Sequence, residues 1–354
     1  MSEDGAVSKY GALPGARVRR FPATAGLRCL ALAVLAGCLC AVTISAMTLG
    51  TTPVSARDVV ATLFAFDGSR EHLIVATVRL PRALAALLAG AALAVAGAIM
   101  QAVTGNPLAS PSLLGVNAGA AFAVVVSISL LGVGSSGVLV WFAFAGAAVA
   151  AATVYVFAAS GPARATPVKL VLAGAVVTAF LTSLTASILI YDRSTLDIVR
   201  LWTAGSLAGR TMQQVVTLAP YIGVGLAASI VVRGHMTTLS LGAETARSVG
   251  QSQGLWRSIS VVIVVLLAGG AVALAGPIGF VGLVVPHTVR FLAGVDYRWI
   301  VPFSALGGAL LVVVADTAGR VLFAHHSFPV GVTMAVIGAP FFIVLARARA
   351  GGRP

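Results

Sequence analysis

Apolar stretches of roughly 20 residues recur along the whole chain, and this recurrence restricts the possible folds more than any other feature. A helix needs about 20 apolar residues to cross the hydrocarbon core of a membrane. A composition that is 59% hydrophobic and 9% charged is also foreign to soluble domains. The sequence therefore predicts an all-α polytopic membrane protein with about ten transmembrane helices. The expected spans are 27–49, 83–103, 113–132, 137–159, 168–190, 213–232, 258–276, 279–293, 301–322 and 330–346. We expect one transmembrane domain over 27–346, between tails at 1–26 and 347–354. The eighth span is short, and Pro277 and Pro286 favour a tilted or partly broken helix there.

One apolar segment is written twice. Residues 87–99 (LLAGAALAVAGAI) and 266–278 (LLAGGAVALAGPI) are identical at nine of thirteen positions, and the same offset of 179 carries Pro107 onto Pro286. Shared Ala and Gly composition is the alternative explanation, since closely packed membrane helices favour small residues. The matching proline outside the Ala-rich part favours a duplication. The copies fall in the second and seventh spans, which cross in opposite directions, so spans 2–5 and 7–10 would form an inverted repeat.

The distribution of Lys and Arg predicts the orientation. If both termini are cytoplasmic, that side holds 15 of the 23 Lys and Arg residues, the asymmetry of the positive-inside rule. Eight remain outside, and four of them, Arg57, Arg70, Arg79 and Arg82, lie just before the second span. We expect a multi-pass protein of the cytoplasmic (inner) membrane. The net charge of +13 follows from this topology, and no basic run on a soluble domain indicates nucleic-acid binding.

Several functional classes are disfavoured by what the chain contains. Its only lysines, Lys9 and Lys169, do not follow a glycine-rich loop, so the chain has no motif for hydrolysing ATP. Cys29, Cys38 and Cys40 all lie in the first span without metal-ligand spacing, and we expect buried structural thiols. The Leu-Ala-Gly-Cys sequence ending at Cys38 resembles a lipoprotein signal, but nine further apolar segments follow it. We expect no enzymatic activity and no cofactor or metal in this chain.

An ion-coupled transporter is the alternative of a different class. Such proteins usually need an ionisable group near the membrane midplane. Of the ten acidic residues, only Asp316 falls inside an apolar span, and Arg320 follows it at i,i+4. That spacing favours a structural ion pair. Coupling through Asp316 stays open as the alternative.

A polar loop offers a place where a partner could supply energy. Residues 240–257 form the longest polar stretch between spans on the expected cytoplasmic side. Gly242 and Gly250 bound a short predicted helix in which Glu244 and Arg247 lie three residues apart. A merely solvated loop is the alternative.

Six ordered motifs extend from residue 79 to residue 342. They are RLPRALAALLAGAALAVAGAIMQAVTGNPLASPSLLGVNAGA (79–120), LWTAGSLAGR (201–210), LGAETARSVG (241–250), ALAGPIGFVGLVVPHTVR (273–290), ADTAGR (315–320) and FPVGVTMAVIGAPFF (328–342). With these motifs the chain resembles FecCD-type permeases, the membrane subunits of ATP-binding-cassette (ABC) importers for iron-siderophores, haem and cobalamin. The resemblance implies a type II importer permease fold, with ten helices per subunit and a channel at a dimer interface.

The resemblance also implies roles for particular residues. It assigns coupling to a cytoplasmic ATPase dimer, which would bind the ATP and magnesium, to Gly242, Glu244, Thr245, Ala246, Arg247 and Gly250. It assigns docking of an extracytoplasmic substrate-binding protein to Arg79, Arg82 and Arg320. Guanidinium groups suit this docking because they bind carboxylates bidentately. Anchoring of helix ends at lipid headgroups is the competing interpretation of these arginines.

The substrate and the dimer partner follow from resemblance alone. The LWTAGSLAGR segment favours a ferric siderophore over haem or cobalamin, and the fifth and tenth spans would flank the pathway. The second permease would be another copy of this chain or a paralogue. One departure is Ser327, where the family often has an acidic residue. His325 and His326 precede it, and adjacent histidines in a loop are more often simply polar than metal ligands.

Overall fold

The described part of the molecule is entirely helical. The computed structural model describes residues 24–50, 52–160, 166–323 and 328–350, and no strand occurs within these ranges. Ser327, His325 and His326 lie outside them.

Seven helices are long and apolar enough to cross a membrane, and three shorter apolar helices bring the number in the described ranges to the expected ten. The long ones are α1 (Ala25–Thr48), α4 (Leu80–Thr104), α6 (Ser136–Ala159), α7 (Pro167–Tyr191), α9 (Met212–Ser240), the continuous α11–η3–α12 (Gln253–Ala275) and α14 (Tyr297–Leu322). The shorter ones are α5 (Val116–Ser129), α13 (Val281–Ala293) and α15 (Val330–Ala350). The eighth span is thus a short helix, α13, with Pro286 inside it.

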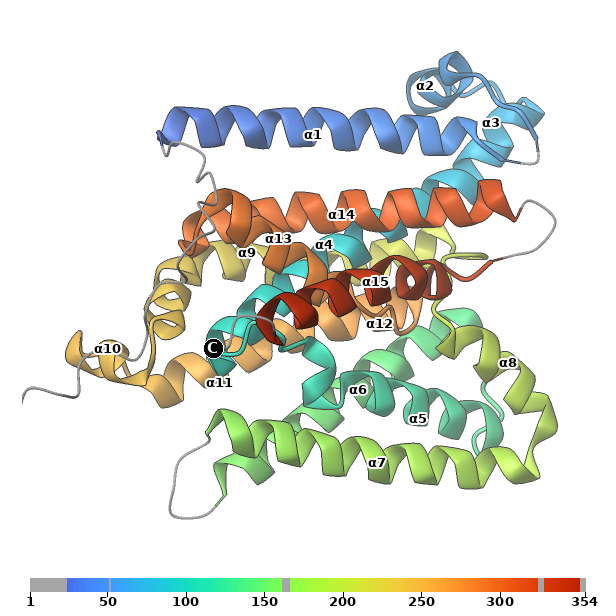
Figure 1. The fold of residues 1–354 in the computed structure, drawn as a ribbon. Helices are drawn as coiled ribbons and strands as arrows, with labels where there is room; N and C mark the ends of the chain where they lie inside the picture. Colours follow the sequence, from blue (N-terminus) through green and yellow to red (C-terminus); the bar gives the residue numbers. More distant parts are fainter. Residues whose placement is uncertain (1–23, 51, 161–165, 324–327, 351–354) are drawn as a thin grey trace, which may run out of the picture.

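Short helices mark the two ends of the bundle (Figure 1). They are α2 (Ala56–Phe64), α3 (Arg70–Ile74), η2 (Pro111–Leu114), α8 (Arg193–Thr203) and α10 (Ala243–Ser248). Helices α2, α3 and α8 lie at one end, which we call the α8 face. Helix α10, the start of α1 and the end of α15 lie at the opposite end, the α10 face. The two described ends of the chain therefore lie on the same side, as an even number of crossings requires.

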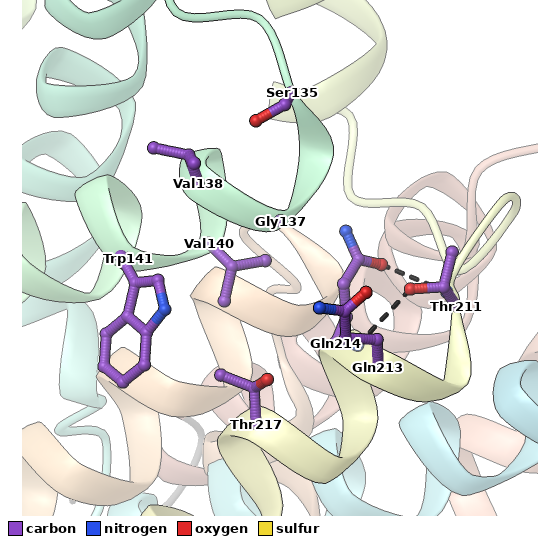
Figure 2. Close-up of a pocket in the computed structure, with 9 residues that line it drawn as sticks. All are labelled: Ser135, Gly137, Val138, Val140, Trp141, Thr211, Gln213, Gln214 and Thr217. Carbon is purple, nitrogen blue, oxygen red and sulfur yellow. Dashed lines mark hydrogen bonds between the residues drawn. The ribbon is translucent and has the colours of Figure 1, made fainter.

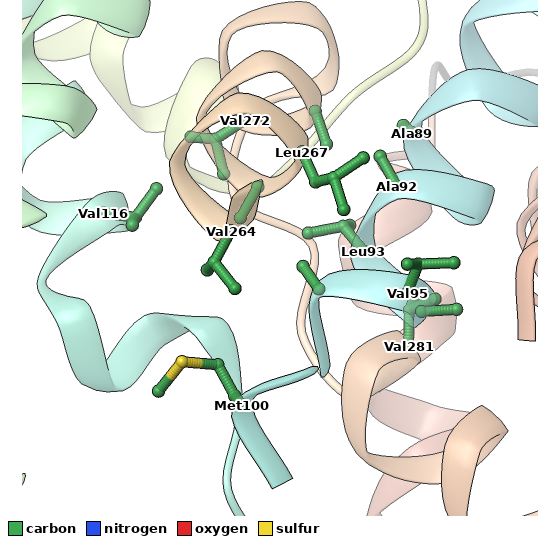
Figure 3. Close-up of a cluster of buried hydrophobic side chains, with 14 of the residues drawn as sticks. Ala89, Ala92, Leu93, Val95, Met100, Val116, Val264, Leu267, Val272 and Val281 are labelled. Carbon is green, nitrogen blue, oxygen red and sulfur yellow. The ribbon is translucent and has the colours of Figure 1, made fainter. Parts of the chain in front are cut away.

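Helix α4 forms the centre of the molecule. Eighteen of its 25 residues are buried, against three of the 25 in α7. Its Ala and Gly residues allow neighbouring backbones to approach on every side. A Cβ atom on Gly90 would lie 2.3 Å from the Gly308 carbonyl oxygen, and one on Gly97 would lie 1.9 Å from that of Gly282. Figure 3 shows the apolar side chains of α4 meeting those of η3, α12, α13 and α5. Glycine is therefore required where α4 crosses α14 and α13.

The duplicated segments lie in helices that run in opposite directions, α4 and η3–α12 (Figure 1). Helix α4 packs on α14 of the second half, whereas α12 packs on α6 of the first half. Each half thus inserts its first helix against the third helix of the other, as an inverted repeat requires. The copies differ at one residue with a visible effect. Pro277 stands where α4 has Ala98. The helix that contains the second copy ends at Ala275, just before this proline, whereas α4 continues to Thr104.

Helix α1 is the outermost element on one side of the bundle. Its contacts within the chain are mainly with α14 and α2. The expectation of buried cysteines is wrong, because Cys29, Cys38 and Cys40 are free and lie on exposed positions of this helix. Apolar thiols need no protein cover where a membrane helix meets lipid. At the α10 face, the Arg28 guanidinium lies 5.4 Å from the ring centre of Trp299 in α14.

Candidate docking and coupling sites

The three arginines assigned to docking lie together at the α8 face, around one buried carboxylate. Asp316 of α14 is 5% exposed. Its two oxygens accept hydrogen bonds from Arg82 of α4, at 2.9 Å from Nε and 2.8 Å from Nη2. Arg320, one turn along α14, adds an ion pair at 3.3 Å. The predicted pair between Asp316 and Arg320 is therefore present. The sequence did not reveal that Arg82, 234 residues away, binds Asp316 through two hydrogen bonds.

The same cluster fastens the end of α1. Arg79 donates to the carbonyl oxygens of Met47, Thr48 and Thr52, the Thr48 bond measuring 3.0 Å. Arg320 donates to the carbonyls of Ala46 and Leu49, at 2.9 Å each. The last carbonyls of a helix have no partner within the helix and carry its negative dipole end, so cationic donors stabilise them. The two guanidinium groups thus close the C-terminus of α1.

The cluster leaves little room for a further ligand. The cavity among these side chains is about 10 Å³, the limit for a single water molecule. The side chains of Arg82 and Arg320 are 17% and 19% exposed, and Arg79 is 8% exposed. The structure brings the three predicted residues together, but each already has partners inside the chain. We call Arg79, Arg82, Asp316 and Arg320 the outer cluster.

The polar loop on the α10 face contains the helix that the sequence predicts. Helix α10 begins after Gly242, whose φ of +109° lies in the left-handed region, and Gly250 closes it with a φ of +73°. Glu244 lies in its first turn and Arg247 in its last, where each charge complements the helix dipole. Glu244, Thr245 and Arg247 are exposed. Glu244 and Arg247 thus present both signs of charge on this face of the chain.

One residue of the predicted contact set points inward. Ala246 is fully buried, and its carbonyl oxygen accepts a hydrogen bond from the Gln251 backbone at 2.9 Å. The Gln251 side chain in turn donates to the His235 carbonyl in α9, at 3.2 Å. Ala246 therefore holds α10 against the bundle, and the surface available to a partner is formed by its exposed neighbours. Helical periodicity over six residues is too short to have revealed this from the sequence.

A cavity of about 530 Å³ opens at the α8 face between the starts of α6 and α9. Figure 2 shows its lining residues around a common space, with Thr211 and Gln214 joined in the capping box that begins α9. Trp141 forms one wall and meets Tyr221 edge-on at 5.7 Å between ring centres. The lining is Ser135, Gly137, Val138, Val140, Trp141, Thr211, Gln213, Gln214 and Thr217. None of these side chains is charged, so this cavity is unsuited to receiving the carboxylates of a docking protein.

Helix α8 is held by a capping carboxylate. Asp192 accepts hydrogen bonds from the Thr195 hydroxyl at 2.6 Å, the Thr195 backbone at 3.0 Å and the Ser194 hydroxyl at 2.7 Å. The Ser129 hydroxyl, at the end of α5, adds a fourth at 2.8 Å. These bonds favour the ionised form, and those from Thr195 contribute most to holding the pKa of Asp192 well below its ordinary value. No group of three or more His, Cys, Asp or Glu residues in the described ranges could hold a metal ion.

The described residues form ten apolar helices in an inverted repeat, with a charged helix on one face, and so define the molecule as a polytopic membrane protein of the permease class. A family model described as the FecCD transport family matches residues 38–348, and the chain belongs to this family.

The chain is similar over most of its length to permeases of iron import systems. It is 46% identical to the Fe(3+)-citrate import system permease protein YfmD of Bacillus subtilis (strain 168) over 301 residues, which cover 85% of this chain and 89% of that protein. It is 42% identical to the ferric enterobactin transport system permease protein FepD of Escherichia coli (strain K12), with coverage of 82% and 87%. Identity to the cobalamin import system permease protein BtuC of Halobacterium salinarum is 38%, with coverage of 78% and 74%.

A solved structure shares this fold. A metal-chelate type ABC transporter in an inward-facing conformation superposes with a TM-score of 0.80 and 25% sequence identity, covering 90% of this chain and 98% of that one. The ten-helix architecture expected from the sequence is therefore that of a known class of ABC transporter permease.

Proposed function

We propose that the chain is the permease subunit of an ABC importer that moves a ferric siderophore across the cytoplasmic membrane, with both termini in the cytoplasm. Helix α10 carries the proposal. It is a helix with exposed residues of both signs of charge, on the same face as both described ends of the chain, in a protein without an ATP-binding motif of its own. Such a surface suits docking into a partly polar cleft of a separate ATPase dimer. Transport would then proceed by alternating access, driven from α10.

Relatives support the substrate class. The chain is 46% and 42% identical to permeases named for ferric citrate and ferric enterobactin, and 38% identical to one named for cobalamin. A ferric siderophore or another ferric chelate is therefore favoured, with haem or cobalamin as the alternative. Iron would arrive already chelated, which removes the need for a metal site in the permease.

The pathway would lie beside α7 and α15, at the contact with a second permease subunit. Only three residues of α7 are buried within the chain. The outward side chains of these two helices are large and apolar, among them Phe180 in α7 and Val336 in α15. A second copy of this chain or a paralogue would cover part of this surface.

Docking of the extracytoplasmic binding protein would use the outer cluster on the α8 face. Arg82 and Arg320 share Asp316, so an incoming carboxylate would compete with this internal acid. Arg82→Gln is expected to weaken binding of the binding protein to the reconstituted complex by at least tenfold, as judged by biolayer interferometry. Arg57→Gln, a change at an exposed arginine on α2, is the control. Equal affinities for the two variants would remove Arg82 from the docking site.

A secondary transporter energised through Asp316 is less well supported. The carboxylate is held by two guanidinium groups, as a structural centre is. If it were instead the coupling site, transport would survive disruption of α10.

The test is a pull-down of the tagged protein from its own host in mild detergent, with partners identified by mass spectrometry. The variant Glu244→Ala/Arg247→Ala is expected to lose the ATPase that the wild type retains. Asp197→Ala/Arg200→Ala is a matched control, because these residues form an exposed i,i+3 pair on α8, at the opposite face. A wild-type complex without an ATPase would overturn the importer, and loss of the ATPase in both variants would overturn the assignment to α10.

A further inference from the structure

A buried polar cluster joins α4, α13 and α14 at the α10 face. Gln101 near the end of α4 and Tyr297 at the start of α14 are 3% and 1% exposed. Arg290 of α13 donates to the Gln101 side-chain oxygen, and to the Tyr297 hydroxyl at 2.8 Å. The Tyr297 hydroxyl donates to the Ala98 carbonyl of α4 at 3.0 Å. We call Gln101, Arg290 and Tyr297 the inner cluster.

The inner cluster is tied to the helix that leads into α10. The Tyr297 backbone N–H donates to the Thr237 hydroxyl oxygen of α9 at 3.0 Å. Thr237 lies in the last turn of α9, which ends at Ser240, two residues before the Gly242 cap of α10. A displacement of α10 therefore reaches Tyr297 through one hydrogen bond and less than two turns of helix.

The segment that follows α10 is tied to α9, and α9 in turn stacks on α11. The ring of His235 in α9 stacks on that of Trp256 in α11, with 3.5 Å between ring centres and 18° between planes. The Gln251 side chain bonds the His235 carbonyl at 3.2 Å. Because the Gln251 backbone also bonds the Ala246 carbonyl of α10, a displacement of α10 would reach the ends of α9 and α11.

On the far side of the inner cluster, α4 and α13 are in direct contact. The Gln101 amide donates to the Gly282 carbonyl at 3.1 Å. One turn away on α4, Gly97 contacts the Gly282 backbone so closely that no side chain fits between them. Whatever displaces Arg290 or Tyr297 therefore carries the central helix of the bundle with it.

The bonds of this cluster are suited to exchange. All acceptors of Arg290 are neutral, an amide and a phenol, and within the described ranges no carboxylate lies in salt-bridge range of this arginine. A guanidinium bound only to neutral acceptors keeps charge-assisted hydrogen bonds but lacks the Coulombic attraction of a full ion pair. The cluster can therefore break and re-form at a lower cost than an ion pair would impose.

We propose that Gln101, Arg290 and Tyr297 are positioning residues that transmit the movement of α10 to α4, α13 and α14, and so couple the ATPase to the opening of the permease. This inference rests on the proposed function, since it requires α10 to receive the ATPase. None of the three residues would touch the ATPase. They act through Thr237 and the end of α9.

Two variants test the inference in opposite directions. Tyr297→Phe removes the hydroxyl that links α13, α14 and α4, and is expected to lower the amount of substrate transported per ATP hydrolysed about fivefold or more, with ATP hydrolysis retained. Gln101→Glu gives Arg290 a carboxylate, and is expected to slow hydrolysis and transport together about fivefold or more, because the cluster is locked by an ion pair. Tyr155→Phe is the control. It also removes a hydroxyl from an interhelical bond, the 2.5 Å contact with Ser258 between α6 and α11.

The measurement uses the complete complex in proteoliposomes with the binding protein and labelled ferric chelate, following ATP hydrolysis and uptake in the same sample. A transport-to-hydrolysis ratio for Tyr297→Phe equal to that of wild type and Tyr155→Phe would overturn the inference, as would unchanged rates for Gln101→Glu. Co-purification of the ATPase with each variant separates this failure from that of the proposed function. If wild type itself carries no ATPase, the proposed function fails first. If every variant carries it and stays coupled, only the inner cluster loses its role.

Discussion

The two ends of the α4–α14 helix pair are held by polar clusters of opposite character. At the α8 face, the outer cluster is built on a carboxylate bound by two arginines, and it fastens the end of α1. At the α10 face, the inner cluster joins Arg290 to neutral acceptors and links the pair to α9. Between them, Gly90 and Gly308 hold the helices in backbone contact. The comparison teaches that one end is built to stay fixed and the other to exchange partners.

The largest effect is expected from Asp316→Asn in the outer cluster. This change leaves the half-buried Arg82 and Arg320 without a counter-charge, and breaking a buried pair in this way costs about 3–5 kcal/mol. Thermal unfolding of the purified protein, followed by fluorescence-detected size exclusion, measures the loss. Arg82→Gln/Asp316→Asn should lose less than the sum of the two single variants, because the pair is removed together. Additive losses would show that the outer cluster is not a coupled unit.

The middle of the helix pair comes next. Gly90→Ala places a Cβ atom 2.3 Å from the Gly308 carbonyl oxygen, which forces α4 and α14 apart. Overpacking of this kind costs about 1–3 kcal/mol. Gly223→Ala in α9 is the control, since its Cβ would meet no atom within 4 Å and alanine is the better helix former. Equal melting temperatures for the two variants would mean that the glycine contact is not needed to hold the ends in register.

The sequence predicts the ten helices because their apolar length is a local property, and it predicts the inverted repeat because the copies remain similar. It does not predict which residues meet. Alanine-rich helices are small and apolar on every side, so no period in the sequence distinguishes a buried face from an exposed one. For this reason, the cysteines of α1 were expected to be buried, whereas they are exposed. Ala246 was missed for another reason, because α10 is too short for its buried side to show as a period. The bond between Arg82 and Asp316 spans 234 residues and leaves no local trace.

The inner cluster did leave a signal that the sequence interpretation passed over. Gln101 is a polar residue at the end of an otherwise apolar span, and Arg290 lies inside the eighth span. Polar groups at such positions are expensive and usually have a partner. Arg79 has a structural function in addition to the docking expected of it. It closes the last turn of α1, an end whose carbonyls need donors wherever the helix stops.

A smaller loss of stability is expected in the inner cluster. Tyr297→Phe and Gln101→Leu each remove hydrogen bonds between membrane helices, which are worth about 0.6 kcal/mol on average and up to about 1.7 kcal/mol. Their melting temperatures should therefore fall much less than that of Asp316→Asn, although the coupling of transport to hydrolysis changes more. If either variant were as unstable as Asp316→Asn, the two ends of the helix pair would be equally rigid and the contrast between them would fail.

The smallest effect concerns a partly exposed carboxylate, Asp192, and it tests whether burial separates the two clusters from the rest of the polar surface. Asp192 caps α8 in its ionised form, and its hydrogen bonds with Thr195 and Ser194 hold its pKa below the ordinary value of 3.8. A carboxyl whose pKa is depressed by folding stabilises the folded state above its unfolded pKa, and this contribution is lost as the pH falls from about 4 towards the depressed value. Hydrogen exchange of the first turn of α8 should therefore accelerate across this range, with little change in global unfolding, because the carboxylate is solvated.

The control is Asp192→Asn, which keeps a capping side chain without the charge. In this variant, the exchange rate of the first turn of α8 should change with pH only as the intrinsic exchange rate of an unprotected amide does. If lowering the pH reduced the global stability of the wild type as much as the Asp316→Asn change does, the cap of α8 would contribute to the stability of the whole fold, as the outer cluster does.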